Sequence, residues 1–441
     1  MYPDFLVIEN VESEFVVDSG DPKLLERITE LLIQGERIFL SGAAGTGKTW
    51  LVKQIARQIA EKEKVVYVTA STGIAASLLF DEIGLRQSFF IKGPSTLHSA
   101  AMLPWSSEKD HTRLIEKGKS RLAGTDVIII DEISILDSET FERFLKRLPV
   151  YPGILVVGDL FQLPPVARDK KNRPNFVFRS KAFNDFRLVE LQKNYRQAEA
   201  DFIIFLENLR HGQNQPDFYL RISSEFDHNH PTLFGTRREA GFKNSLEFSK
   251  LSTKSYTSKC NVKVGDPEKA IEWFENYTRA LHTCQLKKGM RVLCIQNHDE
   301  LVNGDLGTII SISGKEREGN HPDRVRIEFD RNRIGTREMG PYEFKKEVQD
   351  GYTTKVKFSV EQFPIVPAYG LTVHKAQGMT LDICNLDGRK ISFAAGQVYV
   401  AVSRCKTKTG LRIHNANMFQ AFTRKSVEEY YANANRLRLS L

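Results

Sequence analysis

Cysteine is scarce in this chain of 441 residues, and the few cysteines lie far apart. There are five of them, and no two form a C-x-x-C pair: Cys260, Cys284, Cys294, Cys384 and Cys405. Structural zinc sites need closely spaced cysteines or histidines, and a disulfide framework needs many cysteines in a short chain. We therefore expect neither, and a reducing compartment suits this composition.

Long apolar runs are also missing. No run approaches the roughly 18 apolar residues that mark a membrane-spanning helix. The first residues carry acidic side chains where a secretory signal would be basic and then apolar: Asp4, Glu9, Glu12 and Glu14. A signal peptide is therefore not expected. We expect a protein of the cytoplasm, with no membrane partner.

Hydrophobic residues make up 41% of the chain and charged residues 27%, which is normal for a folded protein. The length predicts about two to four domains. Basic residues outnumber acidic ones, and the formal net charge is +8. Such a charge favours a polyanionic partner. Many basic proteins bind no nucleic acid, however, so the charge alone leaves the partner open.

A phosphate-binding loop is the strongest local signal. Residues 42–49 read GAAGTGKT and fit the pattern G-x-x-x-x-G-K-[ST]: Gly42, Ala43, Ala44, Gly45, Thr46, Gly47, Lys48 and Thr49. A strand-like run at 37–40 precedes the loop and a helix-like run at 50–56 follows it. Backbone amides and the helix N-terminus would bind a triphosphate. Lys48 would reach its β- and γ-phosphates, and Thr49 would bind Mg²⁺. The alternative is a glycine-rich turn that matches by chance.

Continuous apolar runs separated by helical patterns predict an α/β fold with a parallel sheet covered on both faces. The runs occupy residues 65–70, 126–130 and 154–157, after the first one at 37–40. A second α/β unit begins near residue 232, and short antiparallel strands between about 285 and 360 interrupt it. Ligands bind parallel sheets at the carboxyl ends of the strands, and polar residues stand at those ends here.

Two carboxylates follow the third of these strands. Behind a phosphate loop, Asp131 would hold Mg²⁺ and Glu132 would act as general base on the attacking water. Gln162, after the next strand, would sense the γ-phosphate. Arg196 and Arg404 are candidates for arginine fingers, worth about 10³ to 10⁵ in rate. The alternatives are a solvated acidic pair at a strand end, a solvated glutamine and surface arginines.

The ordered motifs resemble those of the Pif-type, Dda and RecD group of superfamily 1B DNA helicases. The stretches that carry this resemblance are GAAGTGKT, TASTGIAA, STLHS, DEIS, GDLFQLPPV, LQKNYRQ, LVNGDLGTI, LTVHKAQGMT and GQVYVAVSRC. The resemblance implies two RecA-like P-loop domains, at 1–192 and 193–441. It implies a small insertion at about 88–121 in the first domain and an SH3-like β-barrel at about 250–362 in the second.

The resemblance also implies an ATP- and Mg²⁺-dependent helicase that acts as a monomer. It would move 5′-to-3′ on single-stranded DNA and unwind forked duplex in repair, recombination or replication. Arg196 and Arg404 would come from the second domain, and Gly378 would join the nucleotide site. The implied DNA contacts are Ser71, Thr96, His98, Thr236, Thr372, His374 and Lys375. For the histidines, the alternative is a hydrogen-bonded structural role. The wedge that splits the duplex would be Leu103, Pro104 and Trp105, unless Trp105 anchors a helix to the sheet.

Two departures from the family pattern change the expectations. Family members often carry an adenine-reading glutamine before the first loop, but residues 23–26 here are Lys-Leu-Leu-Glu. We therefore expect loose base selectivity. The segment 134–157 is short, which places the chain nearer to Dda or a bacterial member. Two other functions remain open: a single-strand translocase that unwinds weakly, and a nucleic-acid-binding module with a degenerate ATPase. The complete set of nucleotide-site residues argues against the second.

Overall fold

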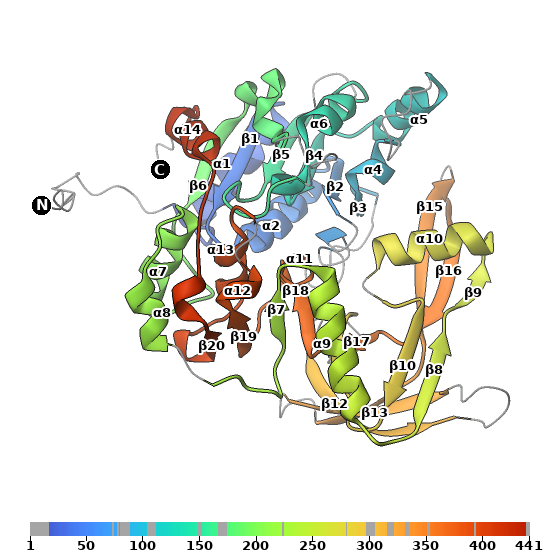
Figure 1. Cartoon of the computed structure of the whole chain (residues 1–441). Coiled ribbons are helices and arrows are strands. Elements are labelled where there is room, and N and C mark those ends of the chain that lie inside the picture. Colours follow the sequence, from blue (N-terminus) through green and yellow to red (C-terminus); the bar gives the residue numbers. More distant parts are fainter. Residues whose placement is uncertain are drawn as a thin grey trace, which may run out of the picture.

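The structure is a computed structural model, and most of the chain is described (Figure 1). The described residues are 17–72, 75–76, 79, 89–103, 112–148, 152–165, 174–222, 225–278, 280–296, 305–314, 322–330, 335–350, 353–391 and 394–437. Within these ranges, no helix is long and apolar enough to cross a membrane.

The first half of the chain forms a six-stranded parallel sheet with the order β3-β2-β4-β5-β1-β6. Its strands are β1 (Arg37–Gly42), β2 (Val66–Ala70), β3 (Ile91–Thr96), β4 (Val127–Asp131), β5 (Gly153–Val157) and β6 (Arg187–Leu191). Successive residues of β4 enter two different apolar clusters, Val127 and Ile129 in one, Ile128 and Ile130 in the other. Both faces are therefore buried, which explains the continuous apolar runs.

Helices cover the two faces of this sheet. One face packs against α1 (Pro22–Ile33) and α2 (Lys48–Glu61), whose buried leucines and isoleucines share its cluster. The other face packs against α4 (Leu97–Ala100), α5 (Thr112–Leu122) and α6 (Ser138–Leu145). Short 3-10 turns η1 (Ile133–Ile135), η2 (Val177–Arg179) and η3 (Lys181–Asp185) complete this half.

The second half contains a four-stranded parallel sheet with the order β18-β7-β19-β20. Its strands are β7 (Thr232–Phe234), β18 (Gly370–Thr372), β19 (Cys384–Asp387) and β20 (Leu411–His414). The helices around it are α7 (Ala200–Arg210), α8 (Pro216–Ile222), α9 (Arg237–Lys250), α11 (Val373–Ala376), α12 (Gly388–Ile391) and α13 (Gln397–Val402), with turns η4 (Lys408–Gly410) and η5 (Ala416–Met418).

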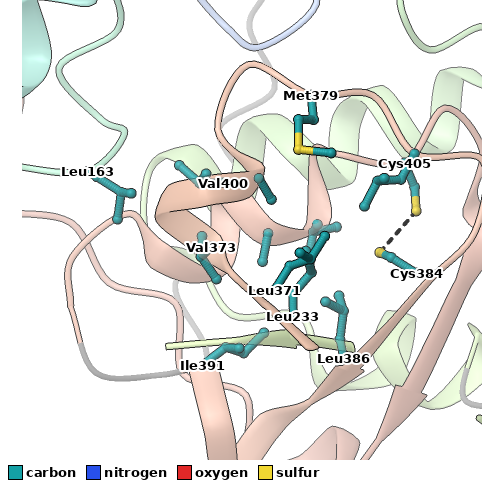
Figure 2. Packing of buried hydrophobic residues seen from close by; sticks show 14 of the residues in the cluster. Leu163, Leu233, Leu371, Val373, Met379, Cys384, Leu386, Ile391, Val400 and Cys405 are labelled. Carbon is teal, nitrogen blue, oxygen red and sulfur yellow. Dashed lines mark hydrogen bonds between the residues drawn. The ribbon is translucent and has the colours of Figure 1, made fainter. Parts of the chain in front are cut away.

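The core of this second unit is apolar and closely packed (Figure 2). Leu371 and Leu386 project from the strands toward Val400 of α13. The thiols of Cys384 and Cys405 lie 3.2 Å apart in the same core. Two parallel sheets flanked by helices confirm the α/β class predicted from the sequence.

Antiparallel strands lie between β7 and β18 in sequence and to the right of them in Figure 1. One sheet has the order β14-β13-β12-β11-β17, another β15-β16-β9, and a pair joins β10 and β8. Their bounds, with the helix between them, are β8 (Ser255–Lys259), β9 (Asn261–Val264), α10 (Pro267–Tyr277), β10 (Thr283–Lys287), β11 (Arg291–Cys294), β12 (Leu306–Ser313), β13 (Arg324–Phe329), β14 (Thr336–Met339), β15 (Tyr342–Asp350), β16 (Thr353–Gln362) and β17 (Ile365–Pro367). That these strands form an SH3-like barrel stays a prediction.

The last helix returns to the first sheet. In Figure 1, α14 (Lys425–Asn433) lies beside β6, and Val427 and Tyr431 enter the apolar cluster of that sheet. After the helix, Leu188 of β6 donates to the Asn435 carbonyl at 2.7 Å and accepts from the Leu437 amide at 2.9 Å. The division at residues 192 and 193 stays a prediction, and α14 packs across it.

Candidate active site

The phosphate loop joins β1 to α2 at the carboxyl edge of the first sheet. Gly45 and Gly47 adopt positive φ angles of 91° and 79°, which residues with a Cβ rarely adopt. A Cβ on Gly45 would also lie 2.7 Å from the Cβ of Arg196. Gly47 caps α2 without a side-chain hydrogen bond, so no side chain of the cap covers the first amides of the helix. This arrangement suits an anion.

Lys48 lies within the loop that it would serve. Its ammonium donates to the carbonyls of Gly42 at 2.7 Å and Ala43 at 2.9 Å. Desolvation lowers the pKa of Lys48 to about 8, against the opposite effect of Asp159 and Glu132. The ammonium therefore holds the loop in shape and lies among carboxylates.

Asp131 and Glu132 stand where β4 ends. The Asp131 carboxylate accepts from the Glu132 amide at 2.8 Å, and Glu132 takes a left-handed backbone with φ 54°. Such a conformation is uncommon outside glycine and is found at functional sites. Burial raises the pKa of both carboxyl groups, and for Asp131 the neighbouring Glu132 adds to the effect. A cation beside this pair would favour its ionised form.

Gln377 connects this pair to the second sheet. Its amide donates to the Glu132 carboxylate at 3.1 Å and to the Gln162 side-chain oxygen at 3.3 Å. Gln377 follows α11, so the second unit reaches the predicted base directly. We did not predict it from the sequence, although it stands between Lys375 and Gly378 in the stretch LTVHKAQGMT. Gly378 itself adopts a φ of 82° beside it.

The two arginines meet at Ser403. Arg196 donates to the Ser403 carbonyl at 3.1 Å, and Arg404 donates to the Ser403 hydroxyl at 2.9 Å. Arg404 is only 2% exposed and also donates to the Val400 carbonyl at 2.9 Å. Burial, together with the nearby Arg196, lowers the pKa of Arg404 to about 9. The structure therefore brings both arginines together at Ser403, with Arg196 next to Gly45 of the phosphate loop. Arg404 is buried and Arg196 partly buried, so neither is a freely exposed surface arginine.

A buried polar network contacts the phosphate loop at Ala44. The Tyr399 hydroxyl of α13 accepts from the Ala44 amide at 2.7 Å and donates to Asp159 at 3.2 Å. Asp159 is fully buried, and Arg210 of α7 donates to both of its oxygens, at 3.2 and 3.3 Å. The sequence had given no reason to single out Tyr399 or Arg210, because each acts through partners far away along the chain.

Two of the three predicted DNA-contact threonines occupy matching positions in the two parallel sheets. Thr96 ends β3 and caps α4, and Thr372 ends β18 and caps α11. Each hydroxyl accepts from an amide three residues later, at 3.1 and 3.2 Å. An accepting hydroxyl keeps its hydrogen for donation. The two units thus present similar donors at the carboxyl ends of two sheets.

The other predicted DNA contacts differ in their surroundings. Ser71 is buried, and its hydroxyl donates to the Asp131 carbonyl at 3.2 Å, so it faces β4. Thr236 is exposed and caps α9: its hydroxyl accepts from the Glu239 amide at 3.3 Å and donates to the Glu239 carboxylate at 2.9 Å. His98 and Lys375 are partly buried, and His374 is exposed at the surface of α11. Although part of the His374 side chain is exposed, surrounding atoms desolvate it, and this together with the charge of Arg237 lowers the pKa of His374.

The wedge prediction needs a correction at Leu103. Leu103 is 4% exposed and belongs to the apolar cluster of the first sheet, so it is not the projecting tip that a wedge needs. Its amide is also fixed, donating to the His98 carbonyl at 2.9 Å. Pro104 and Trp105 lie outside the described residues, and their role as a wedge stays a prediction.

Comparison with known proteins agrees with this geometry. A family model described as PIF1-like helicase matches residues 22–216. The chain is 29% identical to the ATP-dependent DNA helicase Pif1 of Campylobacter jejuni, covering 88% of this chain and 90% of that protein. It is 28% identical to PIF1 of Emericella nidulans, over 91% of this chain, and spans only 61% of that longer relative.

Solved structures share the fold. The Pif1 helicase of Candida albicans superposes with a TM-score of 0.72 at 29% identity, covering 94% of this chain and 99% of that one. A Bacteroides Pif1 in complex with ADP-AlF4 gives the same TM-score of 0.72 at 24% identity, over 95% of this chain and 99% of that one. Both structures support two RecA-like domains as the architecture of the parallel sheets.

Proposed function

We propose that this chain, which by its sequence and fold is a Pif1-type helicase of superfamily 1B, moves 5′-to-3′ along single-stranded DNA as it hydrolyses ATP. ATP-dependent DNA helicase is the activity that the names of its relatives state. One observation carries the coupling of hydrolysis to movement: Gln377 of the second unit hydrogen-bonds both Glu132 and Gln162 of the first. This contact links the residues proposed to hydrolyse ATP to the position of the second unit relative to the first. The 5′-to-3′ direction rests on the resemblance to this helicase group.

The hydrolysis itself follows from the positions of the polar groups. Lys48 would exchange the carbonyls of Gly42 and Ala43 for the β- and γ-phosphates, which offer stronger, charge-assisted partners. Glu132 would accept a proton from the attacking water. Arg196 and Arg404, already paired through Ser403, would stabilise the charge that develops on the γ-phosphate.

The residues present fit a magnesium ion. Mg²⁺ usually takes one or two protein ligands and completes its shell with phosphates and waters. Thr49 at the start of α2 and Asp131 at the end of β4 would hold it, and the buried Asp131 carboxylate is more readily ionised beside a cation. When bound, the ion would neutralise charge on the β- and γ-phosphates.

DNA would lie across the carboxyl ends of both sheets. The hydroxyls of Thr96 and Thr372 are equivalent donors on the first and second sheet. Contacts of this kind with phosphates hold a strand without reading its sequence. A strand held by both units would respond whenever the gap between them changes. Single-stranded and forked DNA as preferred substrates, action as a monomer and location in the cytoplasm belong to the same proposal.

A forked-duplex assay with separate 5′ and 3′ tails tests the proposal. We expect unwinding only of substrates with a 5′ single-stranded tail, and only with ATP and Mg²⁺. Removing Mg²⁺ with a chelator should stop both ATPase and unwinding. Unwinding from the 3′ tail would overturn the polarity. DNA-stimulated ATPase and displacement of a protein block without unwinding would instead indicate a translocase.

A further inference from the structure

Tyr431 lies outside the motifs in sequence, yet its ring packs against the loop that carries Gln162. It belongs to α14, is 6% exposed, and stacks on Phe161 at 4.8 Å with 15° between the ring planes. Phe161 is the residue before Gln162. The Arg210 guanidinium covers both rings, at 4.7 Å from the Phe161 centroid and 5.6 Å from that of Tyr431. The tyrosine is therefore packed against the Gln162 loop.

The hydroxyl of Tyr431 joins two parts of the first unit. It lies 2.5 Å from the hydroxyl of Ser41 and accepts from the Leu160 amide at 3.2 Å. Ser41 is the residue before Gly42, where the phosphate loop begins. Leu160 lies two residues before Gln162, in the loop that follows β5. A single hydroxyl from 390 positions away from Ser41 thus bridges the two loops that would contact the γ-phosphate.

At its start, the Gln162 loop is tied to β1 by the Gly158 amide, which donates to the Leu40 carbonyl at 3.1 Å. Within it, the Phe161 amide donates to the Asp159 carboxylate at 3.2 Å and the Gln162 amide to the Asp159 carbonyl at 3.0 Å. The bonds within the loop shape it but do not locate it relative to Gly42. Tyr399 locates Asp159 relative to Ala44, and Tyr431 locates Leu160 relative to Ser41.

The segment that follows α14 holds Tyr431 in place. Residues 435–437 pair with Leu188 at the edge of the first sheet, in parallel. Arg436 donates to Glu190 at 3.1 Å, and Arg210 donates to the same carboxylate at 3.0 Å. Backbone hydrogen bonds and an ion pair both fix the segment after α14. The Tyr431 hydroxyl is therefore held in one position when the phosphate loop or the Gln162 loop moves.

We infer that Tyr431 is a positioning residue for ATP hydrolysis, setting the distance between the phosphate loop and Gln162 through its hydroxyl. The inference rests on the proposed function. The inference assigns a role to α14: this helix would hold the phosphate loop and the Gln162 loop at a fixed distance. The helix itself lies outside the motifs that carry the chemistry. Tyr431 itself touches neither nucleotide nor DNA in this scheme.

Tyr431→Phe tests the inference, because it keeps the ring stack and removes only the hydroxyl. The variant leaves the buried Leu160 amide and Ser41 hydroxyl without this partner. Because the bridge positions the two loops for hydrolysis, kcat for DNA-stimulated ATP hydrolysis should drop about tenfold, which corresponds to about 1.4 kcal/mol. The KM for ATP and the Kd for single-stranded DNA should stay within about twofold of wild type.

Tyr219→Phe is the matched control. Tyr219 is also buried, but its hydroxyl has no hydrogen-bond partner among the described residues. This variant should keep wild-type kcat. Ser41→Ala removes the other end of the bridge with little change in volume, and it should lower kcat by a similar factor. The double variant Ser41→Ala/Tyr431→Phe should be no worse than Tyr431→Phe alone, since the two groups act together.

A purely structural role gives a different pattern. Tyr431→Phe would then lower the Tm but keep wild-type kcat well below it, and the inference would be overturned. Additive losses in the double variant, or a rise in KM alone, would overturn it as well. Failure of the proposed function looks different again, because the wild-type protein itself would show no DNA-stimulated ATPase.

Discussion

The Gln377 side chain donates a hydrogen bond to Glu132 at 3.1 Å, although 245 positions separate the two residues. The bond joins the general base predicted on the first sheet to the turn after α11 on the second. The same amide reaches Gln162 at 3.3 Å. A change in the gap between the two units must therefore stretch or break contacts to both residues, which ties water activation to domain position.

Gln377→Glu should uncouple the two units. The variant places a carboxylate where an amide now donates to Glu132, and two carboxylates at such a distance cannot both ionise freely. We expect kcat with saturating DNA to fall about tenfold or more, where each 1.36 kcal/mol corresponds to a factor of ten. Steady-state ATPase with and without single-stranded DNA measures the change. Gln213→Glu, at an exposed glutamine, should behave as wild type; equal activity of both variants would refute the coupling.

Lys48→Ala and Glu132→Gln should separate binding from chemistry. Lys48→Ala removes the charge that would meet the phosphates, so both affinity for ATP and turnover should be lost. Glu132→Gln keeps the shape and removes the base, so ATP should still bind while hydrolysis falls by about 10² to 10⁴. Equilibrium binding of a fluorescent ATP analogue, alongside ATPase, distinguishes them. Substantial turnover in Glu132→Gln would assign the base elsewhere.

Part of this site was predictable because parallel strands bring their carboxyl ends to one edge. Lys48 follows β1 and Asp131 ends β4, so a pattern of apolar runs was enough to expect them together. The α/β class followed from the same runs. Local pattern could not assign Gln377 or Tyr431, because their roles depend on contacts with residues hundreds of positions away.

Leu103 is a residue for which the local sequence pattern fits two different placements. An apolar residue beside a proline and a tryptophan reads equally well as an exposed tip or as a core side chain, and only its packing against the first sheet decides. The position of α14 was likewise not predictable. Its buried residues Val427 and Tyr431 require an apolar partner, but nothing in their spacing says which sheet supplies it.

Base selectivity should be loose. The segment where the family often carries an adenine-reading glutamine lies here on α1, and Lys23–Glu26 contains none. A site that lacks a hydrogen-bonding partner for one base has little means of rejecting another. We expect GTP to support DNA-stimulated hydrolysis within about tenfold of ATP in kcat/KM, a window of 1.4 kcal/mol. A far larger preference for ATP would mean that another residue reads the base.

Single-strand binding should weaken steeply with salt. Each neutralised phosphate contributes about −0.7 to the slope of log K against log salt. Lys375→Ala should reduce the magnitude of that slope by about 0.7 and weaken all sequences alike. Lys62→Ala is the control, since Lys62 is exposed at the end of α2 remote from the phosphate loop. A slope that Lys375→Ala leaves unchanged would remove this lysine from the DNA path.

Thr372 allows its two roles to be separated. Its hydroxyl caps α11, and the proposal has the same hydroxyl donating to a DNA phosphate. Asparagine and aspartate both serve as N-caps and have nearly the same shape. Thr372→Asn and Thr372→Asp should therefore both retain the cap. Only aspartate, however, places a negative charge against the phosphate.

The pair of variants should differ in DNA affinity far more than in stability. Fluorescence anisotropy with labelled single-stranded DNA should show Thr372→Asp binding at least about tenfold more weakly than Thr372→Asn, a difference of about 1.4 kcal/mol. The Tm values of the two should lie within a few degrees. Thr96 occupies the equivalent position in the first sheet, so Thr96→Asn and Thr96→Asp should reproduce the difference. If aspartate and asparagine bind DNA equally at both positions, these threonines are caps alone and the DNA follows another path.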